Sequence, residues 1–214
     1  MPRLGLIGAL TWNFSIRLSE LLSLGRERWW WQMHAALRRE FRGLNPNKMV
    51  LNMRGPYHVD SLAYGETPAL SFLKILDTLQ LPAGSQIVDL GSGRGVPCLT
   101  AAAARGYKAL GLEYFAVYTE RAQRVAERHG WPAQFVSGNF LRRPLPAAQL
   151  YFISATAFPE ELRQQLLELL QQVPAGSWVV CQDWVLEAPF ELDRMQQLPV
   201  SWGIAKICYH RRLP

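Results

Sequence analysis

Three glycines at alternate positions, Gly91, Gly93 and Gly95, follow the apolar run 86–90, whose one charged residue is Asp89. Glycine has no Cβ atom, so a ligand can approach the backbone closely at such a turn. Glu113 ends the next apolar run, 24 positions after Asp89. A carboxylate at that distance is suited to accept hydrogen bonds from the two hydroxyls of a ribose. The spacing therefore predicts a nucleotide-like ligand at the carboxyl edge of a sheet.

The turn differs from a dinucleotide fingerprint, because Val96 stands where the third glycine of G-x-G-x-x-G is required. An acid directly before the first glycine is also unfavourable beside a pyrophosphate. Asp89 suits S-adenosylmethionine better, because this ligand has no phosphate and carries a positive ammonium and a positive sulfonium. We therefore expect S-adenosylmethionine as the cofactor, with a purely structural glycine turn as the alternative.

The positive charge of the chain is unevenly distributed. The 214 residues, 49% hydrophobic and 19% charged, are typical of one globular α/β domain with a modest addition. The net charge is +6, of which residues 1–48 hold +5, from eight Arg/Lys and three Glu. This segment predicts a contact with nucleic acid, an acidic partner or an anionic membrane surface, and a solvated helix face is the alternative.

The three cysteines, Cys98, Cys181 and Cys208, are far apart and have neither disulfide nor metal-ligand spacing. We expect them to be small core residues in a reducing compartment, which makes the cytoplasm the expected location, and we expect no metal site.

The start of the chain resembles a short signal-peptide core over residues 4–10. Polar residues interrupt it from Asn13 onwards, and no cleavage site follows, so no transmembrane segment is predicted. The run Trp29-Trp30-Trp31, flanked by arginines, suits either a peripheral membrane contact or packing on the main domain.

Apolar periodicity predicts helices at 15–24 and 26–41, and a helix to about 79 with Thr67 as N-cap and Pro68 as first residue. Strands and helices then alternate. Strands are expected at 86–90, 108–112, 134–137, 150–154 and 178–182, near 189–195 and at 204–209, with helices at 96–105, 116–129 and 159–172. This order predicts a Rossmann-like, doubly wound, mostly parallel seven-stranded sheet. Residues 1–56 are expected to form an N-terminal helical extension, and residues 57–214 the main domain.

Four segments in order resemble a known family. They are Tyr64-Gly65-Glu66-Thr67, the DLGSG turn that starts at Asp89, Gly138-Asn139-Phe140-Leu141, and Val200-Ser201-Trp202. Together they are similar to the non-SET histone-lysine methyltransferases of the "disruptor of telomeric silencing" type. The resemblance covers about residues 57–214. It implies a class I fold, S-adenosylmethionine as methyl donor and a protein substrate methylated on a lysine amine.

The resemblance also implies roles for individual residues. Tyr64, Glu66 and Thr67 would fold over the methionine end of the donor. Asp89, Gly91 and Gly93 would form its cradle, and Glu113 would hold the ribose. At the adenine, Asn139 stands where the family has Asp, and its carbonyl oxygen can still accept from the amino group. Phe140 would pack on the ring.

The chain departs from the family at the end of the fourth strand. The family has an Asn pair there, beside the substrate amine, whereas this chain has Ser154 and Ala155 in the segment that ends at Phe158. Ser154, Thr156 and Phe158 become the candidate catalytic residues, the hydroxyls as acceptors and Phe158 as a channel wall. An RNA or small-molecule acceptor, or a fold that binds without turnover, remain alternatives.

The expected reaction, a methyl transfer, needs little acid–base catalysis. Transfer of a methyl group from a sulfonium is an in-line displacement that needs the nucleophile about 3 Å from the methyl carbon and water excluded. No acid–base pair or metal is required, and none of the four histidines has an evident partner in the sequence.

Overall fold

The computed structural model describes residues 6–44 and 65–214, and a seven-stranded sheet forms its centre. The strands are β1 (Gln86–Leu90), β2 (Lys108–Glu113), β3 (Ala133–Ser137), β4 (Leu150–Ile153), β5 (Trp178–Gln182), β6 (Phe190–Val200) and β7 (Gly203–Arg212). Their order is β3-β2-β1-β4-β5-β7-β6. The first five strands pair in parallel, and β7 is antiparallel to both β5 and β6. The predicted Rossmann-like sheet is confirmed.

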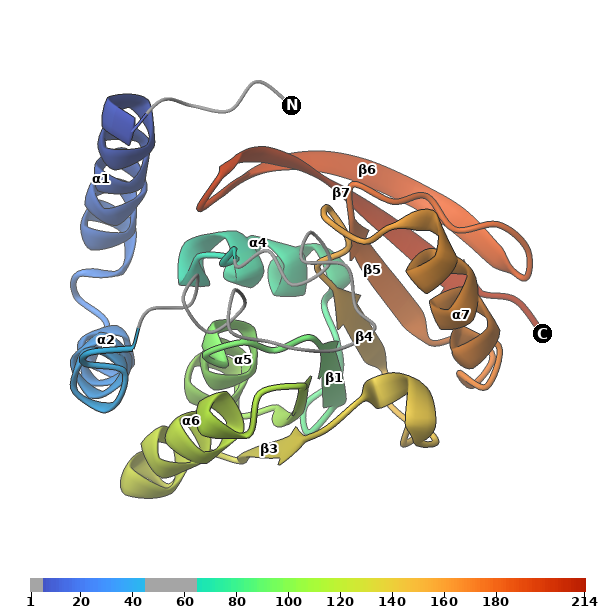
Figure 1. The fold of residues 1–214 in the computed structure, drawn as a ribbon, viewed down its shortest axis with the longest axis horizontal. Coiled ribbons are helices and arrows are strands. Elements are labelled where there is room, and N and C mark those ends of the chain that lie inside the picture. The colour runs from blue at the N-terminus through green and yellow to red at the C-terminus, as the bar shows by residue number, and fades with distance from the viewer. Residues whose placement is uncertain (1–5, 45–64) are drawn as a thin grey trace.

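Helices cover both faces of the sheet (Figure 1). They are α1 (Leu6–Leu24), α2 (Arg28–Glu40), α4 (Ala69–Leu79), α5 (Val96–Arg105), α6 (Ala116–His129) and α7 (Glu160–Leu170), with a short 3-10 turn η2 (Phe140–Arg142). The helices α4, α5 and α6 lie on one side and α7 on the other, while α1 and α2 lie outside the first group (Figure 1). Because the parallel strands all end at one edge, the loops after β1, β2, β4 and β5 meet there.

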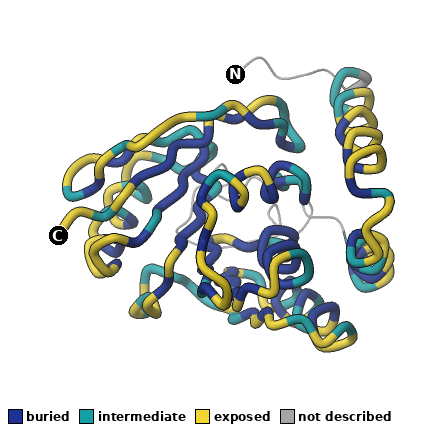
Figure 2. The backbone as a smooth tube through the Cα atoms, turned by 180° about the vertical axis from the view of Figure 1, so that it is seen from behind, coloured by how far each residue is buried: buried dark blue, intermediate teal, exposed yellow. Residues whose placement is uncertain are grey.

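Three groups of buried side chains form the core, and the backbone of buried residues is dark blue in Figure 2. One joins α2 to α5 and α6, and it includes Trp30, Met33 and Leu37 of α2. A second lies between α4 and the sheet, and a third lies under α7 on the opposite face. Helix α2 therefore shares a core with α5, the helix that follows the glycine turn, and with α6.

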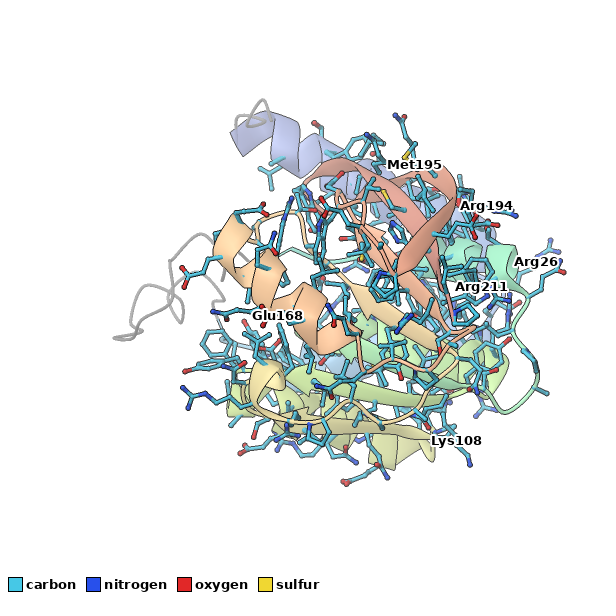
Figure 3. All side chains as sticks on the ribbon, turned by 90° about the vertical axis from the view of Figure 1, so that its right-hand side faces the viewer. Arg26, Lys108, Glu168, Arg194, Met195 and Arg211 are labelled. Atoms are coloured by element: carbon cyan, nitrogen blue, oxygen red, sulfur yellow. The ribbon has the colours of Figure 1, made fainter. Side chains whose placement is uncertain are left out.

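The last two strands are longer than the sequence predicted. The predicted strands were near 189–195 and at 204–209. Strand β6 instead continues to Val200, β7 already starts at Gly203, and a two-residue turn joins them. The edge strand β6 has few apolar side chains in its middle, where Arg194 and Met195 are exposed (Figure 3). An edge strand with one solvated face shows a weak apolar signal, which explains the underestimate.

Two predictions about helix starts are wrong. Helix α1 begins at Leu6, not at residue 15, because the apolar run that resembled a signal peptide continues the same helix. Helix α4 begins at Ala69 with Pro68 as N-cap and no side-chain cap of its own. The carboxylate of Glu20 on α1 accepts from the backbone N–H of Leu70 at 3.3 Å, so a neighbouring helix supplies the cap. The hydroxyl of Thr67 has a different partner, described below.

The three cysteines are buried, and none forms a disulfide, as expected. Across residues 6–44 and 65–214, every helix is too short or too polar to cross a membrane.

Candidate functional site

The glycine turn after β1 is fastened to the end of β2. The backbone N–H groups of Gly91 and Ser92 donate to the carbonyl of Leu112 at 2.8 and 3.1 Å. Gly91 and Gly95 have φ values of +93° and +83°, a region that glycine adopts easily. A Cβ atom on Gly95 would lie 2.5 Å from the Phe135 ring, so this glycine serves packing. A Cβ on Gly91 would meet no atom of residues 6–44 or 65–214 within 4 Å, apart from its chain neighbours, so these residues leave open space beside the turn.

Two buried carboxylates lie next to the glycine turn. Glu113, at the end of β2, accepts from the backbone N–H of Gly93 at 2.8 Å and of Phe115 at 3.0 Å. Asp89, near the end of β1, is almost fully buried. Burial, together with the charge of Glu113, raises the pKa of Asp89 to about 8. Burial also raises the pKa of Glu113, and the backbone donors oppose this effect.

These features fit an adenosyl sulfonium compound. The space beside Gly91 is open, and each Glu113 oxygen, which accepts one backbone N–H, has a second lone pair that a hydroxyl could use. Asp89 is a desolvated acid whose charged form a nearby cation would stabilise. A ligand with a phosphate at this turn would meet two carboxylates instead.

Two of the four family-like segments contact each other, namely residues 64–67 and residues 200–202. Tyr64 falls outside the described residues, but Gly65 and Glu66 are placed. The backbone N–H of Glu66 donates to the Ser201 hydroxyl at 2.8 Å, and the Ser201 N–H donates to the Glu66 carbonyl at 3.0 Å. A Cβ atom on Gly65 would lie 2.2 Å from the Trp202 ring, so only glycine fits under this indole.

We expect Gly65→Ala to lower the free energy of unfolding by about 1–3 kcal/mol, because the added methyl overlaps the Trp202 ring. Chemical denaturation measures the change. In a Trp202→Ala background the same methyl has room, so the cost of Gly65→Ala should become small. An equal cost in both backgrounds would mean that the ring contact does not restrict position 65.

Glu66 forms a two-point ion pair with the glycine turn. Arg94 donates from Nε to one Glu66 carboxylate oxygen at 2.6 Å and from a terminal nitrogen to the other at 2.5 Å. Both side chains are about three-quarters buried, and the Arg94 guanidinium lies 5.7 Å from the centre of the Phe41 ring. The pair ties the loop before α4 to the loop after β1. Sequence reasoning missed Arg94, because nothing in its local pattern distinguishes it from a solvated arginine.

A buried hydrogen-bond chain crosses the carboxyl edge. The Ser154 hydroxyl at the end of β4 donates to Gln182 Oε1 at 2.7 Å, and Gln182 Nε2 donates to the Thr67 hydroxyl at 2.7 Å. Gln182 is fully buried at the end of β5. Two predicted site residues are thus joined through a third that was not predicted.

A parallel contact lies beside this chain. The Thr156 hydroxyl donates to Asp183 Oδ2 at 2.7 Å, and the other Asp183 oxygen accepts from the backbone N–H of Lys206 at 2.9 Å. Asp183 has a φ of +53°, which is uncommon for a residue with a side chain and is typical of functional loops. A signal existed for Gln182 and Asp183, since two polar residues end the otherwise buried strand β5.

The remaining candidates have structural contacts. Asn139 caps η2, because its side-chain oxygen accepts from the Leu141 N–H at 2.9 Å, and that oxygen can accept a second hydrogen bond. Phe140 and Phe158 are partly buried against the cluster under α7.

The expectation that no histidine has a partner is wrong for two of them. His210 is buried in β7 and accepts from the Leu186 N–H at 3.0 Å. His34 on α2 lies 3.7 Å from the Glu20 carboxylate and contacts Arg17, and burial, with the Arg17 charge, lowers the pKa of His34 to about 4. Both sets of partners are distant in sequence or on another element, so local patterns could not show them.

Comparison with known proteins places the chain among methyltransferases. A family model described as "Histone methylation protein DOT1" matches residues 46–199. A histone-lysine N-methyltransferase, H3 lysine-79 specific, of Caenorhabditis elegans is 33% identical over 138 residues, covering 56% of this chain and 14% of that protein. The 24-methylenesterol C-methyltransferase 2 of Oryza sativa subsp. japonica is 26% identical over 138 residues, covering 62% of this chain and 38% of that protein. The chain therefore spans less than half the length of these relatives.

Solved structures agree on the fold. An RNA methyltransferase from Salinibacter ruber, in complex with S-adenosyl-L-homocysteine, superposes with a TM-score of 0.56 at 22% identity. The match covers 70% of this chain and 94% of that one.

Proposed function

We propose that this chain, which belongs to the family described as "Histone methylation protein DOT1" and carries its class I methyltransferase domain, methylates a lysine amine of a protein. S-adenosylmethionine supplies an activated methyl group on its sulfonium. The two hydroxyls that follow β4, which are hydrogen-bonded to Gln182 and Asp183 at the end of β5, select an amine as the acceptor. We assign catalysis to residues 57–214 and treat 1–56 as an extension that contributes α2 to the core.

The donor is assigned to the space beside Gly91. Asp89 would face the cationic methionine end, and Glu113 would accept from the ribose hydroxyls. The ion pair between Glu66 and Arg94 would close over the same end and exclude water. Exclusion of water strengthens each of these charge interactions and prevents hydrolysis of the sulfonium.

The acceptor is assigned to the row formed by Ser154 and Thr156. Each hydroxyl already gives its proton, to Gln182 and to Asp183 respectively. Its oxygen therefore presents lone pairs, which accept from N–H groups. Two such acceptors can hold the two hydrogens of a neutral amine and leave the nitrogen lone pair to attack the methyl carbon. The hydroxyls thus replace the amide oxygens that the resemblance places here.

A lysine substrate must arrive charged and react neutral. The negative charge of Asp183 beside the row favours the approach of an ammonium. The positive sulfonium of the donor then disfavours the positive charge of that ammonium and lowers its pKa. Desolvation in the site lowers the amine pKa further, so the ammonium gives its proton to bulk water before the methyl transfer. No dedicated base is needed.

The test is transfer from labelled S-adenosylmethionine into a lysate by the purified chain, followed by digestion with protease or RNase. The expected label is removed by protease and is found as Nε-methyl-lysine by mass spectrometry. Label that RNase removes, or that extracts into organic solvent as a lipid, would contradict the proposal and favour an RNA or small-molecule acceptor. Donor binding without any transfer would favour a fold that has lost turnover.

A paired substitution tests the hydroxyl row. We expect Ser154→Ala and Thr156→Ala each to lower kcat about 10–100-fold, because an acceptor that orients the amine is lost. The Kd for S-adenosylmethionine, measured by calorimetry, should stay within about twofold. Ser15→Ala, at an exposed hydroxyl on α1 that bonds within its own helix, is the control and should change neither value. Unchanged kcat in both row variants would remove the assignment.

Location in the cytoplasm is part of this proposal. The three buried, unpaired thiols support it, because they suit a reducing compartment.

A further inference from the structure

The outward side of α1 is apolar along most of its length. Five large apolar side chains on this helix are exposed, with between 41% and 80% of their surface accessible. They are Leu10, Phe14, Leu18, Leu21 and Leu22. At about 100° of rotation per residue they span an arc of about 120°. We call them the α1 apolar face.

The opposite side of α1 faces the domain. Ile16, Glu20 and Leu24 are buried there, and the Trp12 indole donates to the Val200 carbonyl at 2.7 Å. A surface helix normally turns its charges outward and its apolar stripe inward. This helix instead buries a glutamate and exposes leucines, and Figure 2 shows the exposed side of α1 turned away from the rest of the fold. An exposed apolar stripe of this size indicates a binding surface.

The corner between α1 and α2 adds positive charge and an aromatic ring. Trp31 is half exposed, and its indole N–H donates to the Gly25 carbonyl at 2.8 Å, which holds the ring at the end of α1. Four arginines at this corner and along α2 are exposed, and Glu27 is the one exposed acid among them. The four are Arg26, Arg28, Arg38 and Arg39. The Glu40 carboxylate does not offset them, because Arg124 and Arg128 bind it.

We infer that the α1 apolar face and this basic corner bind an anionic lipid surface, with α1 lying in the plane of the interface. Apolar side chains enter the boundary between headgroups and acyl chains, while arginines and a tryptophan remain at the headgroups. The charges are complementary, since clustered arginines are attracted to anionic headgroups. None of the described helices can span a bilayer, so the contact is peripheral.

Other occupants match this surface less well. RNA would pair with the arginines but would leave the α1 apolar face without an apolar partner. A second copy would cover the apolar face, but it brings the same arginines and no acidic cluster to meet them.

The lipid contact and the candidate site share one helix. From its buried side α1 binds the turn that carries Ser201, through Asn13 at 3.1 Å, and caps α4 through Glu20. A lipid surface bound to the outward side therefore lies close to the loop that holds Glu66. This inference does not depend on which acceptor is methylated.

The test is flotation of the full chain with vesicles of phosphatidylcholine alone or mixed with phosphatidylglycerol. We expect binding to the mixed vesicles, weakened at least about tenfold in pure phosphatidylcholine. The double variant Phe14→Ser/Leu22→Ser should lose at least about tenfold in affinity, since two large apolar side chains no longer enter the interface. Arg26→Glu/Arg28→Glu should lose binding to the anionic vesicles. Met195→Ser, which changes an exposed apolar side chain on β6 instead, is the control and should bind normally (Figure 3).

All substituted side chains are exposed, so thermal melting and S-adenosylmethionine affinity should stay unchanged in every variant. Absence of flotation with the anionic vesicles overturns the inference. So does equal flotation of the Phe14→Ser/Leu22→Ser variant. A dimer in light scattering that this variant abolishes, without vesicle binding, would identify a second copy as the occupant. RNA binding lost only in the arginine variant, again without vesicle binding, would identify nucleic acid.

Discussion

Asp89→Asn is expected to lower the affinity for S-adenosylmethionine about 100-fold, because a buried carboxylate that can face a cation is replaced by a neutral amide. The same change should make the ligand-free chain relatively more stable as the pH rises. The two effects have one cause, which is the cost of holding a negative charge at this buried position without a counter-ion.

The sign of the pH effect follows from the pKa of Asp89. It is raised from 3.8 to about 8 in the folded chain, so the folded state binds a proton that the unfolded state has released between these values. The stabilising contribution is fully present below pH 3.8 and is lost as the pH rises towards 8. Asn does not titrate. The stability difference should therefore move in favour of the variant between pH 5 and 8, by up to about 1.4 kcal/mol per pH unit.

Urea denaturation at several pH values measures the stability, and calorimetry measures the affinity. In the parent chain a bound cation lowers the Asp89 pKa, so binding at pH 7 should release a proton, which shows as a buffer-dependent binding enthalpy. Asp77→Asn, at an exposed aspartate paired with Arg105, is the control and should keep both the affinity and the proton release. A stability difference independent of pH, or unchanged affinity in Asp89→Asn, would refute this role.

Gly91→Ala should reduce S-adenosylmethionine affinity at least about tenfold, because its Cβ enters the space that the donor is proposed to occupy. The substitution also places a side chain at φ +93°, which costs about 1–2 kcal/mol of stability.

Gly84→Ala separates these two effects. Gly84 lies in the turn before β1, has φ +74°, and its Cβ would also meet no atom of the described part of the chain within 4 Å. It carries a similar backbone cost far from the glycine turn after β1. We expect comparable melting temperatures for the two variants in the absence of ligand, and a loss of affinity in Gly91→Ala alone. Equal affinities would show that the donor does not lie beside Gly91.

Much of the fold was predictable because its signals are local. The strands β1 and β5 were placed with their observed ends, since short buried runs bounded by turn residues have few alternatives. The helix α6 was also placed, where Gly130 ends the apolar periodicity. The start of α1 and the length of β6 were not predicted correctly. An exposed apolar helix and a half-solvated edge strand both depart from the usual pattern of apolar residues.

The sequence by itself determined the glycine turn, the acids Asp89 and Glu113, and the family, because these depend on residue type and on spacing within one β-α-β unit. Tertiary structure decided the partners. Gln182 binds Thr67 across 115 positions and Ser154 across 28, and Trp202 covers Gly65 across the fold. It also decided which side of α1 meets solvent. In the sequence, the five leucine and phenylalanine side chains indicate a buried face. In the structure, Glu20 and Trp12 pack against the domain, so the opposite side of the helix is the buried one. Such contacts arise when distant segments pack together, and no local pattern specifies them.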